Sequence, residues 1–396
     1  MLQNKVPNVR FCKYLDIWKT TKLNKITEII GGGTPDTKQF SYWNGGINWF
    51  SPTEVGKTVY LTKSEKTISQ LGLQKSSAKL LPAFKTILFT SRAGIGDVGI
   101  ITEESATNQG FQSLVVNEET DVYFLYSYSD QIKKYALKHS AGSTFLEISG
   151  KELGKMDLSI PSLPEQSAIG SLFCTLDDLL ASYKDNLTNY QSLKATMLSK
   201  MFPKAGQTVP EIRLYGFEGE WEEKEFIKIV NRVTESSDSD SLPKVEFEDI
   251  ISGQGKLNKD ISSKFDNRKG ILFKPGYTLY GKLRPYLNNW LLPKFEGVAL
   301  GDFWVFDPNG NNSDFIYYLV QSSRYQKVAN DTSGTKMPRS DWKSVSTTIF
   351  AIPQTIAEQQ AIGAYFSNLD NLINSHQEKI SQLETLKKKL LQDMFI

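Results

Sequence analysis

The chain has 396 residues, 39% hydrophobic and 23% charged, which predicts two or three folded domains and excludes a single small module or a disordered chain. Two cysteines and two histidines are too few for a disulfide framework or a His-rich metal site, and a net charge of +2 is too even to indicate a nucleic-acid-binding protein by itself. We expect a cytoplasmic protein, because the N-terminal sequence has no signal-peptide pattern and no stretch approaches the ~18 apolar residues of a membrane span.

Residues 1–157 are predicted to form a first globular domain. Short strand-like runs are separated by irregular polar loops, which indicates a mixed α/β or α+β domain with mostly antiparallel strands. The strand-like runs begin at Ile47, Thr86, Asp97 and Ser113, and the clearest helical stretch begins at Val122.

A long helix is predicted within residues 158–205. From Glu165 onward, apolar side chains recur at alternating spacings of four and three, the heptad pattern of a coiled-coil seam. Proline precedes this stretch and none interrupts it, so the helix can run for about 38 residues, or ~57 Å. The seam comprises Ile169, Phe173, Leu176, Leu180 and Leu187, with Tyr183 and Tyr190 at the same spacing.

A second domain is predicted over residues 206–350, after a linker-like stretch between Pro203 and Ile212. Strand-like runs begin at Tyr277 and Val298, and a helical stretch begins at Phe315. The run SSDSDS from Ser236 has the composition of an acidic, flexible loop.

The remaining residues, 351–396, repeat the first long helix. EQQAIG from Glu358 matches EQSAIG from Glu165 at a constant offset of 193, and both copies end in Met-Phe. A single heptad helix cannot bury its own seam, so the two copies are each other's obvious partner, although homodimeric coiled coils between chains are an open alternative. The second seam comprises Ile362, Phe366, Leu369, Ile373 and Ile380, with His376 and Leu383.

The two domains repeat one another more faintly. Trp18 and Trp221 open similar segments, and LFTSRAG from Leu88 resembles LYGKLRP from Leu279. We therefore predict that Arg92 and Arg284 lie at matching strand ends. The chain is predicted to be organised as domain, long helix, domain, long helix.

Two glycine-rich segments resemble nucleotide-binding motifs, but their sequence context does not support that function. GIGDVG at residues 94–99 has dinucleotide-binding spacing, but a strand and turn follow it where a helix is required. GGGTP at residues 31–35 lacks the Lys-Ser/Thr of a phosphate-binding loop and is more simply a tight turn. No nucleophile, metal or methyltransferase motif stands out.

Polar loops suited to DNA recur in both domains. Arg, Lys, Asn and Gln can pair with base edges, and Thr and Lys can contact phosphates. Each loop taken singly is equally compatible with a structural role. The DNA-binding candidates are Thr34, Arg92, Asn108, Gln109, Lys282, Arg284, Tyr286, Lys336 and Arg339.

The duplicated pattern, in which IPxLxEQxAIGxxFxxLDxLI leads into a heptad helix ending in LLxxMF, resembles the DNA-specificity subunit of type I restriction–modification systems. The resemblance implies two target-recognition domains held apart by two long antiparallel coiled-coil helices, with pseudo-twofold symmetry. Each domain would read one half of a bipartite, asymmetric site in double-stranded DNA. The second domain departs from the pattern, because TESSDSDSLPKV from Thr234 stands where a GGTP turn is expected.

The same resemblance implies the partners. The helices would dock two methylating subunits, and translocating restriction subunits would then join. The chain itself would be non-catalytic and bind no cofactor, with S-adenosylmethionine, ATP and Mg²⁺ on the partner subunits. A non-catalytic coiled-coil scaffold joining two protein-binding domains is the alternative, which salt-dependent DNA binding would distinguish.

Overall fold

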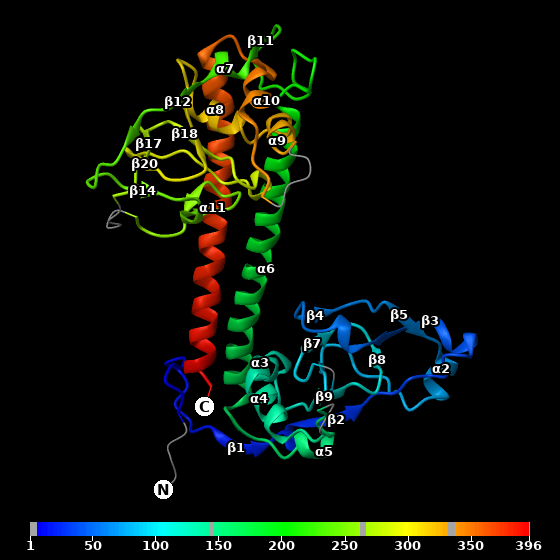
Figure 1. Ribbon diagram of the computed structural model, residues 1–396. Helices are drawn as coiled ribbons and strands as arrows, with labels where there is room; N and C mark the ends of the chain where they lie inside the picture. The colour runs from blue at the N-terminus through cyan, green and yellow to red at the C-terminus, as the bar shows by residue number, and fades with distance from the viewer. Residues whose placement is uncertain (1–5, 93, 143–145, 262–266, 332–336, 396) are drawn as a thin grey trace. The chain divides into compact units, whose positions relative to one another are not determined.

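The computed structural model describes residues 6–92, 94–142, 146–261, 267–331 and 337–395 (Figure 1). The chain divides into two compact units. The first comprises residues 1–184 and 379–396, and the second comprises residues 185–378. Each unit therefore contains one globular part and a segment of both long helices.

The first unit is built on a five-stranded sheet in the order β2-β9-β6-β7-β4, in which only the β4–β7 pair is parallel. A three-stranded sheet, β5-β3-β8, and the antiparallel pair β1–β10 complete it. The strands are β1 Lys19–Lys22, β2 Thr27–Gly31, β3 Trp43–Phe50, β4 Tyr60–Leu61, β5 Lys66–Ile68, β6 Thr86–Phe89, β7 Val98–Ile101, β8 Ser105–Thr107, β9 Gln112–Val116 and β10 Asp157–Ile160. The short helices are α1 Leu23–Ile26, α2 Gln70–Gln74, α3 Val122–Ser127, α4 Ser129–His139 and α5 Gly150–Leu153.

The second unit repeats this plan. An antiparallel sheet in the order β12-β21-β18-β19 corresponds to β2-β9-β6-β7, and β11–β22 corresponds to β1–β10. A second sheet, β13-β17-β20-β14, and the hairpin β15–β16 flank it. The strands are β11 Glu222–Glu225, β12 Asn231–Val233, β13 Ser236–Ser237, β14 Lys244–Val245, β15 Ile250–Ile251, β16 Lys256–Leu257, β17 Gly270–Phe273, β18 Thr278–Gly281, β19 Trp290–Leu291, β20 Gly297–Ala299, β21 Phe303–Asp307 and β22 Ile349–Ile352. The short helices are α7 Phe226–Ile229, α8 Ser313–Leu319, α9 Ser323–Ala329 and α10 Trp342–Thr347.

The long helices are α6, Leu163–Lys200, and α11, Ile356–Asp393, each of 38 residues. They run antiparallel within each unit. In the first unit, Phe395 just after α11 packs on Phe173 near the start of α6, with a ring distance of 5.7 Å. In the second unit, Phe202 just after α6 stacks on Phe366 near the start of α11 at 6.0 Å. The terminal Met-Phe pairs of the repeat thus close the two cores.

The fold class and the internal repeat predicted from sequence are confirmed. The helical stretches predicted from Val122 and Phe315 are helical, and each is divided into two short helices, α3–α4 and α8–α9. In the second unit the break has a local cause, because the Ser322 hydroxyl accepts a hydrogen bond from the Tyr325 amide and caps a new helix.

Candidate nucleic-acid interface

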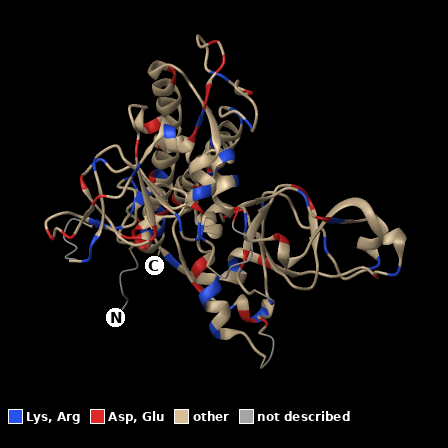
Figure 2. Ribbon diagram, turned by 45° about the horizontal axis from the view of Figure 1, so that its top comes forward, with Lys and Arg blue, Asp and Glu red and all other residues tan. Residues whose placement is uncertain are grey.

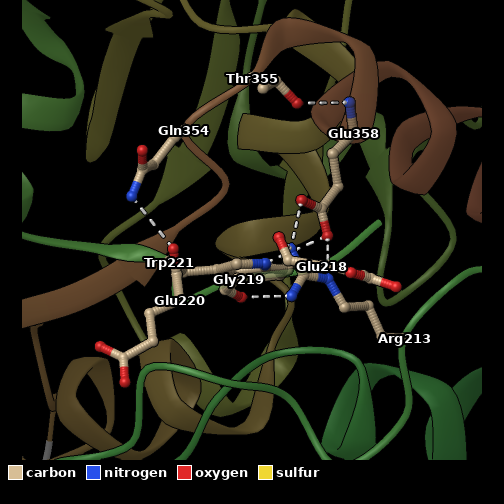
Figure 3. Close-up of polar contacts among 8 residues, drawn as sticks. All are labelled: Arg213, Glu218, Gly219, Glu220, Trp221, Gln354, Thr355 and Glu358. Atoms are coloured by element: carbon tan, nitrogen blue, oxygen red, sulfur yellow. Dashed lines mark hydrogen bonds and ion pairs between the residues drawn. The ribbon is translucent and has the colours of Figure 1, made fainter. Parts of the chain in front are cut away.

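A buried ion pair fixes the start of α11 (Figure 3). Arg213 donates from Nε to Oε1 of Glu358 at 2.7 Å and from Nη2 to Oε2 at 2.8 Å. Trp221 donates to the same carboxylate at 3.1 Å, and the Gly219 carbonyl accepts another guanidinium bond. This carboxylate ties the first residues of the second domain to the long helix.

The first unit contains the same arrangement. Arg10 donates to both oxygens of Glu165 at 2.6 and 2.7 Å, and Trp18 donates to Oε1 at 3.4 Å. Sequence analysis identified the glutamates and tryptophans but missed the arginines. Arg10 and Arg213 are 203 residues apart, as are the two tryptophans, so the same alignment could have found them.

The Gln and Gly residues of the EQxAIG motif join each long helix to the short helix that follows the main sheet, α3 in the first unit and α8 in the second. Gln166 accepts from the Asp121 amide at 3.1 Å, and its counterpart Gln359 accepts from the Asn312 amide at 2.9 Å. A Cβ on Gly170 would lie 2.5 Å from Oδ1 of Asp121, so this close approach requires glycine.

Lysine–aspartate pairs link the long helices reciprocally. Lys194 of α6 contacts Asp370 of α11 at 2.7 Å in the second unit, and Lys387 of α11 contacts Asp177 of α6 in the first. The predicted seams face inward in both units. Leu187, Ile380 and Leu383 are half-buried, and the other Ile, Leu and Phe residues of the two seams are buried. The helix pair is thus held by both apolar packing and reciprocal charge pairs.

In the first unit, three segments meet beyond the end of β6, which we call the first junction: residues 90–92, 108–111 and 146–148. The Ser91 amide donates to the Gly110 carbonyl at 2.8 Å, and the Ile148 amide donates to the Ser91 carbonyl at 3.1 Å. Four candidates lie in or beside it. Thr34 hydrogen-bonds Gln109, and Asn108 accepts from the Gly110 amide. The backbone of Arg92 forms an isolated antiparallel β-bridge with Glu147.

The second junction, residues 281–284, 301–303 and 337–340, has the same backbone pattern. The Lys282 amide donates to the Asp302 carbonyl at 2.9 Å, and the Ser340 amide donates to the Lys282 carbonyl at 2.9 Å. The side chains differ. Asp302 contacts Nη2 of Arg339 at 3.0 Å and Nζ of Lys282 at 3.6 Å, so two candidates share one carboxylate that sequence analysis missed.

The hydrogen bonds correct one alignment. Ser91 occupies the position of Lys282, so Arg92 corresponds to Leu283 and Arg284 lies one residue further on. Arg284 also has a left-handed φ of 48°, and its amide donates to the Pro338 carbonyl at 2.7 Å. The two arginines thus project from different backbone positions.

Two further candidates complete the set. Tyr286 is 58% exposed in the short 3-10 helix Pro285–Leu287 beside the second junction. Lys336 lies outside the described residues.

Charges of both signs are interspersed over both units (Figure 2). Among the described residues, no group of three or more His, Cys, Asp or Glu side chains could hold a metal ion. In the same part of the chain, no helix is long and apolar enough to cross a membrane.

The fold and junctions define an internally duplicated protein that displays different polar surfaces on two copies of one scaffold. A family described as "Type I restriction modification DNA specificity domain" matches residues 16–189 and 224–385. The MjaIX specificity subunit of the type I restriction enzyme of Methanocaldococcus jannaschii is 25% identical over 403 residues, covering 94% of this chain and 91% of the relative. The EcoR124I/EcoR124II specificity subunit of Escherichia coli is 30% identical over 179 residues, 43% of each chain.

Solved structures show the same fold. The type I restriction–modification system S subunit from M. genitalium superposes with a TM-score of 0.62 at 14% identity, covering 99% of each chain. The chain belongs to the family of type I restriction–modification DNA specificity subunits. Family membership confirms the predictions that the chain is a DNA-recognition subunit and not an enzyme in its own right.

Proposed function

We propose that this chain recognises a bipartite, asymmetric site in double-stranded DNA, one half-site for each unit. The observation that carries the proposal is the pair of junctions. Their backbone hydrogen bonds match, yet Ser91, Gly110 and Glu147 in the first are replaced by Lys282, Asp302 and Arg339 in the second. Two units with the same backbone but different hydrogen-bond donors and acceptors are suited to two different half-sequences, because base edges are discriminated by their donor and acceptor patterns.

The long helices supply the surface for the methylating partner in this proposal. Among the exposed leucines on these helices are two pairs related by the repeat offset of 193. Leu179 and Leu372 are 42% and 41% exposed, and Leu193 and Leu386 are 36% and 45% exposed. Because each unit carries one residue of each pair, the surface is presented twice. Two equivalent surfaces favour two copies of one partner.

Catalysis and cofactors belong to the partners in this proposal. The methylating subunits would bind S-adenosylmethionine, and restriction subunits would bind ATP and Mg²⁺. The side chains of the present chain would orient the DNA and hold the partners.

The test is reconstitution of the full-length chain with its methylating subunit. We expect sequence-specific methylation of a site with two unlike half-sequences separated by an unread spacer, in a complex with two methylating subunits per chain by native mass spectrometry. Specific methylation of a palindromic or continuous site would refute the bipartite reading. Methyl transfer by the chain alone would refute the division of labour.

A further inference from the structure

In the second junction, the Asp302 carboxylate binds one edge of the Arg339 guanidinium. Nε of Arg339 donates to both oxygens of Asp302 at 3.3 Å, and Nη2 donates to Oδ2 at 3.0 Å. No acceptor among the described residues contacts Nη1 of Arg339, and the side chain is 51% exposed. The fork formed by Nη1 and the outer hydrogen of Nη2 is therefore available to an external ligand.

The backbone of Asp302 is fixed by the turn that carries it. Gly301 has a φ of 84°, and the Phe303 amide donates to the Gly301 carbonyl at 3.0 Å. The Asp302 carbonyl accepts from the Lys282 amide at 2.9 Å. The hydrogen bond from Arg339 also holds the pKa of the Asp302 carboxyl below its usual value, so the carboxylate is ionised at neutral pH.

We infer that Asp302 is a positioning residue that holds Arg339 side-on, so that the free guanidinium fork reads one guanine in the half-site bound by the second unit. This inference rests on the proposed DNA recognition. Guanine presents two acceptors, O6 and N7, on one edge in the major groove, and they match the arginine fork. A phosphate at the same fork would lie close to the Asp302 carboxylate, whose negative charge opposes it.

The first unit lacks this device. Gly110 occupies the position of Asp302 and has no side chain, and Glu147 occupies the position of Arg339 with the opposite charge. The arginine reading therefore concerns one half-site only. This restriction gives the test an internal reference, because the half-site read by the first unit should be unaffected.

The test uses the reconstituted complex of full-length chain and methylating subunit, with a randomised DNA library selected by binding. In Asp302→Ala, we expect the preference for guanine at one position of one half-site to fall about tenfold or more. Arg339→Ala should lose the same preference. The double variant should be no worse than Arg339→Ala alone, because Asp302 acts through that side chain.

Glu211→Gln is the matched control. Glu211 also contacts two cations, Lys200 at 2.6 Å and Lys204 at 3.6 Å, but it lies outside both junctions. We expect its base preferences to equal those of the wild type. An Asp302→Asn variant, which keeps the shape but removes the charge, should fall between wild type and Asp302→Ala.

Three results would overturn the inference. The first is an unchanged guanine preference in Asp302→Ala. The second is a uniform gain in affinity for all sequences, which would mean that Asp302 merely repels phosphate. The third is a uniform loss of affinity, which would mean that Asp302 has a structural role. Failure of the wild-type complex to select any sequence would instead overturn the proposed function, so the two failures are distinguishable.

Discussion

The buried pair Arg213–Glu358 provides a quantitative test of how the second long helix is anchored. Replacing Glu358 by Ala leaves a guanidinium that is only 15% exposed without its carboxylate, and leaves Trp221 without an acceptor. Breaking a buried ion pair costs about 3–5 kcal/mol. Because Arg213 keeps the Glu218 and Gly219 carbonyls as partners, we expect the lower end, about 3 kcal/mol.

Urea unfolding followed by circular dichroism measures this loss. At an m value of about 2 kcal/mol per molar, the transition of the second unit should move down by about 1.5 M. Glu358→Gln should lose less, because its amide oxygen can still accept from Arg213. Glu222→Gln, which removes an exposed partner of Lys224, is the control and should change stability by less than about 0.5 kcal/mol. A loss in Glu358→Ala as small as in this control would refute the reasoning.

The remaining predictions concern packing, seam and spacing. Gly363→Ala should lower stability by about 1 kcal/mol despite better helix propensity, because its Cβ would lie 2.7 Å from Cβ of Asp314, and a gain in the unfolding midpoint would contradict this. Leu369→Asp should weaken the helix pair by several kcal/mol without changing the methylated sequence, which thermal melts and methylation mapping would check. Inserting four residues after both Leu187 and Ile380 adds ~6 Å per helix and should lengthen the unread spacer by one or two base pairs, whereas methylation at the original spacing only would show that the helices do not set it.

The sequence by itself determined the architecture at the level of periodic pattern. A heptad seam is a local property of the order of apolar residues, so Ile169, Phe173 and their counterparts could be assigned to a helix interface without coordinates. Duplication is likewise visible in one dimension, because Glu165 and Glu358 lie in nearly identical stretches. From these two features followed the two domains, the two long helices and the family resemblance.

Tertiary structure decided the contacts between residues distant in the chain. Glu358 contacts Arg213, 145 residues away in the sequence, and Asp302 contacts Arg339, 37 residues away. At these sequence separations, no periodicity relates the partners. The offset between Arg92 and Arg284 depended in the same way on which carbonyl accepts which amide, since a one-residue change of register alters the backbone position from which a side chain projects. The candidate site is therefore a matter of strand register and turn geometry, which composition and spacing do not encode.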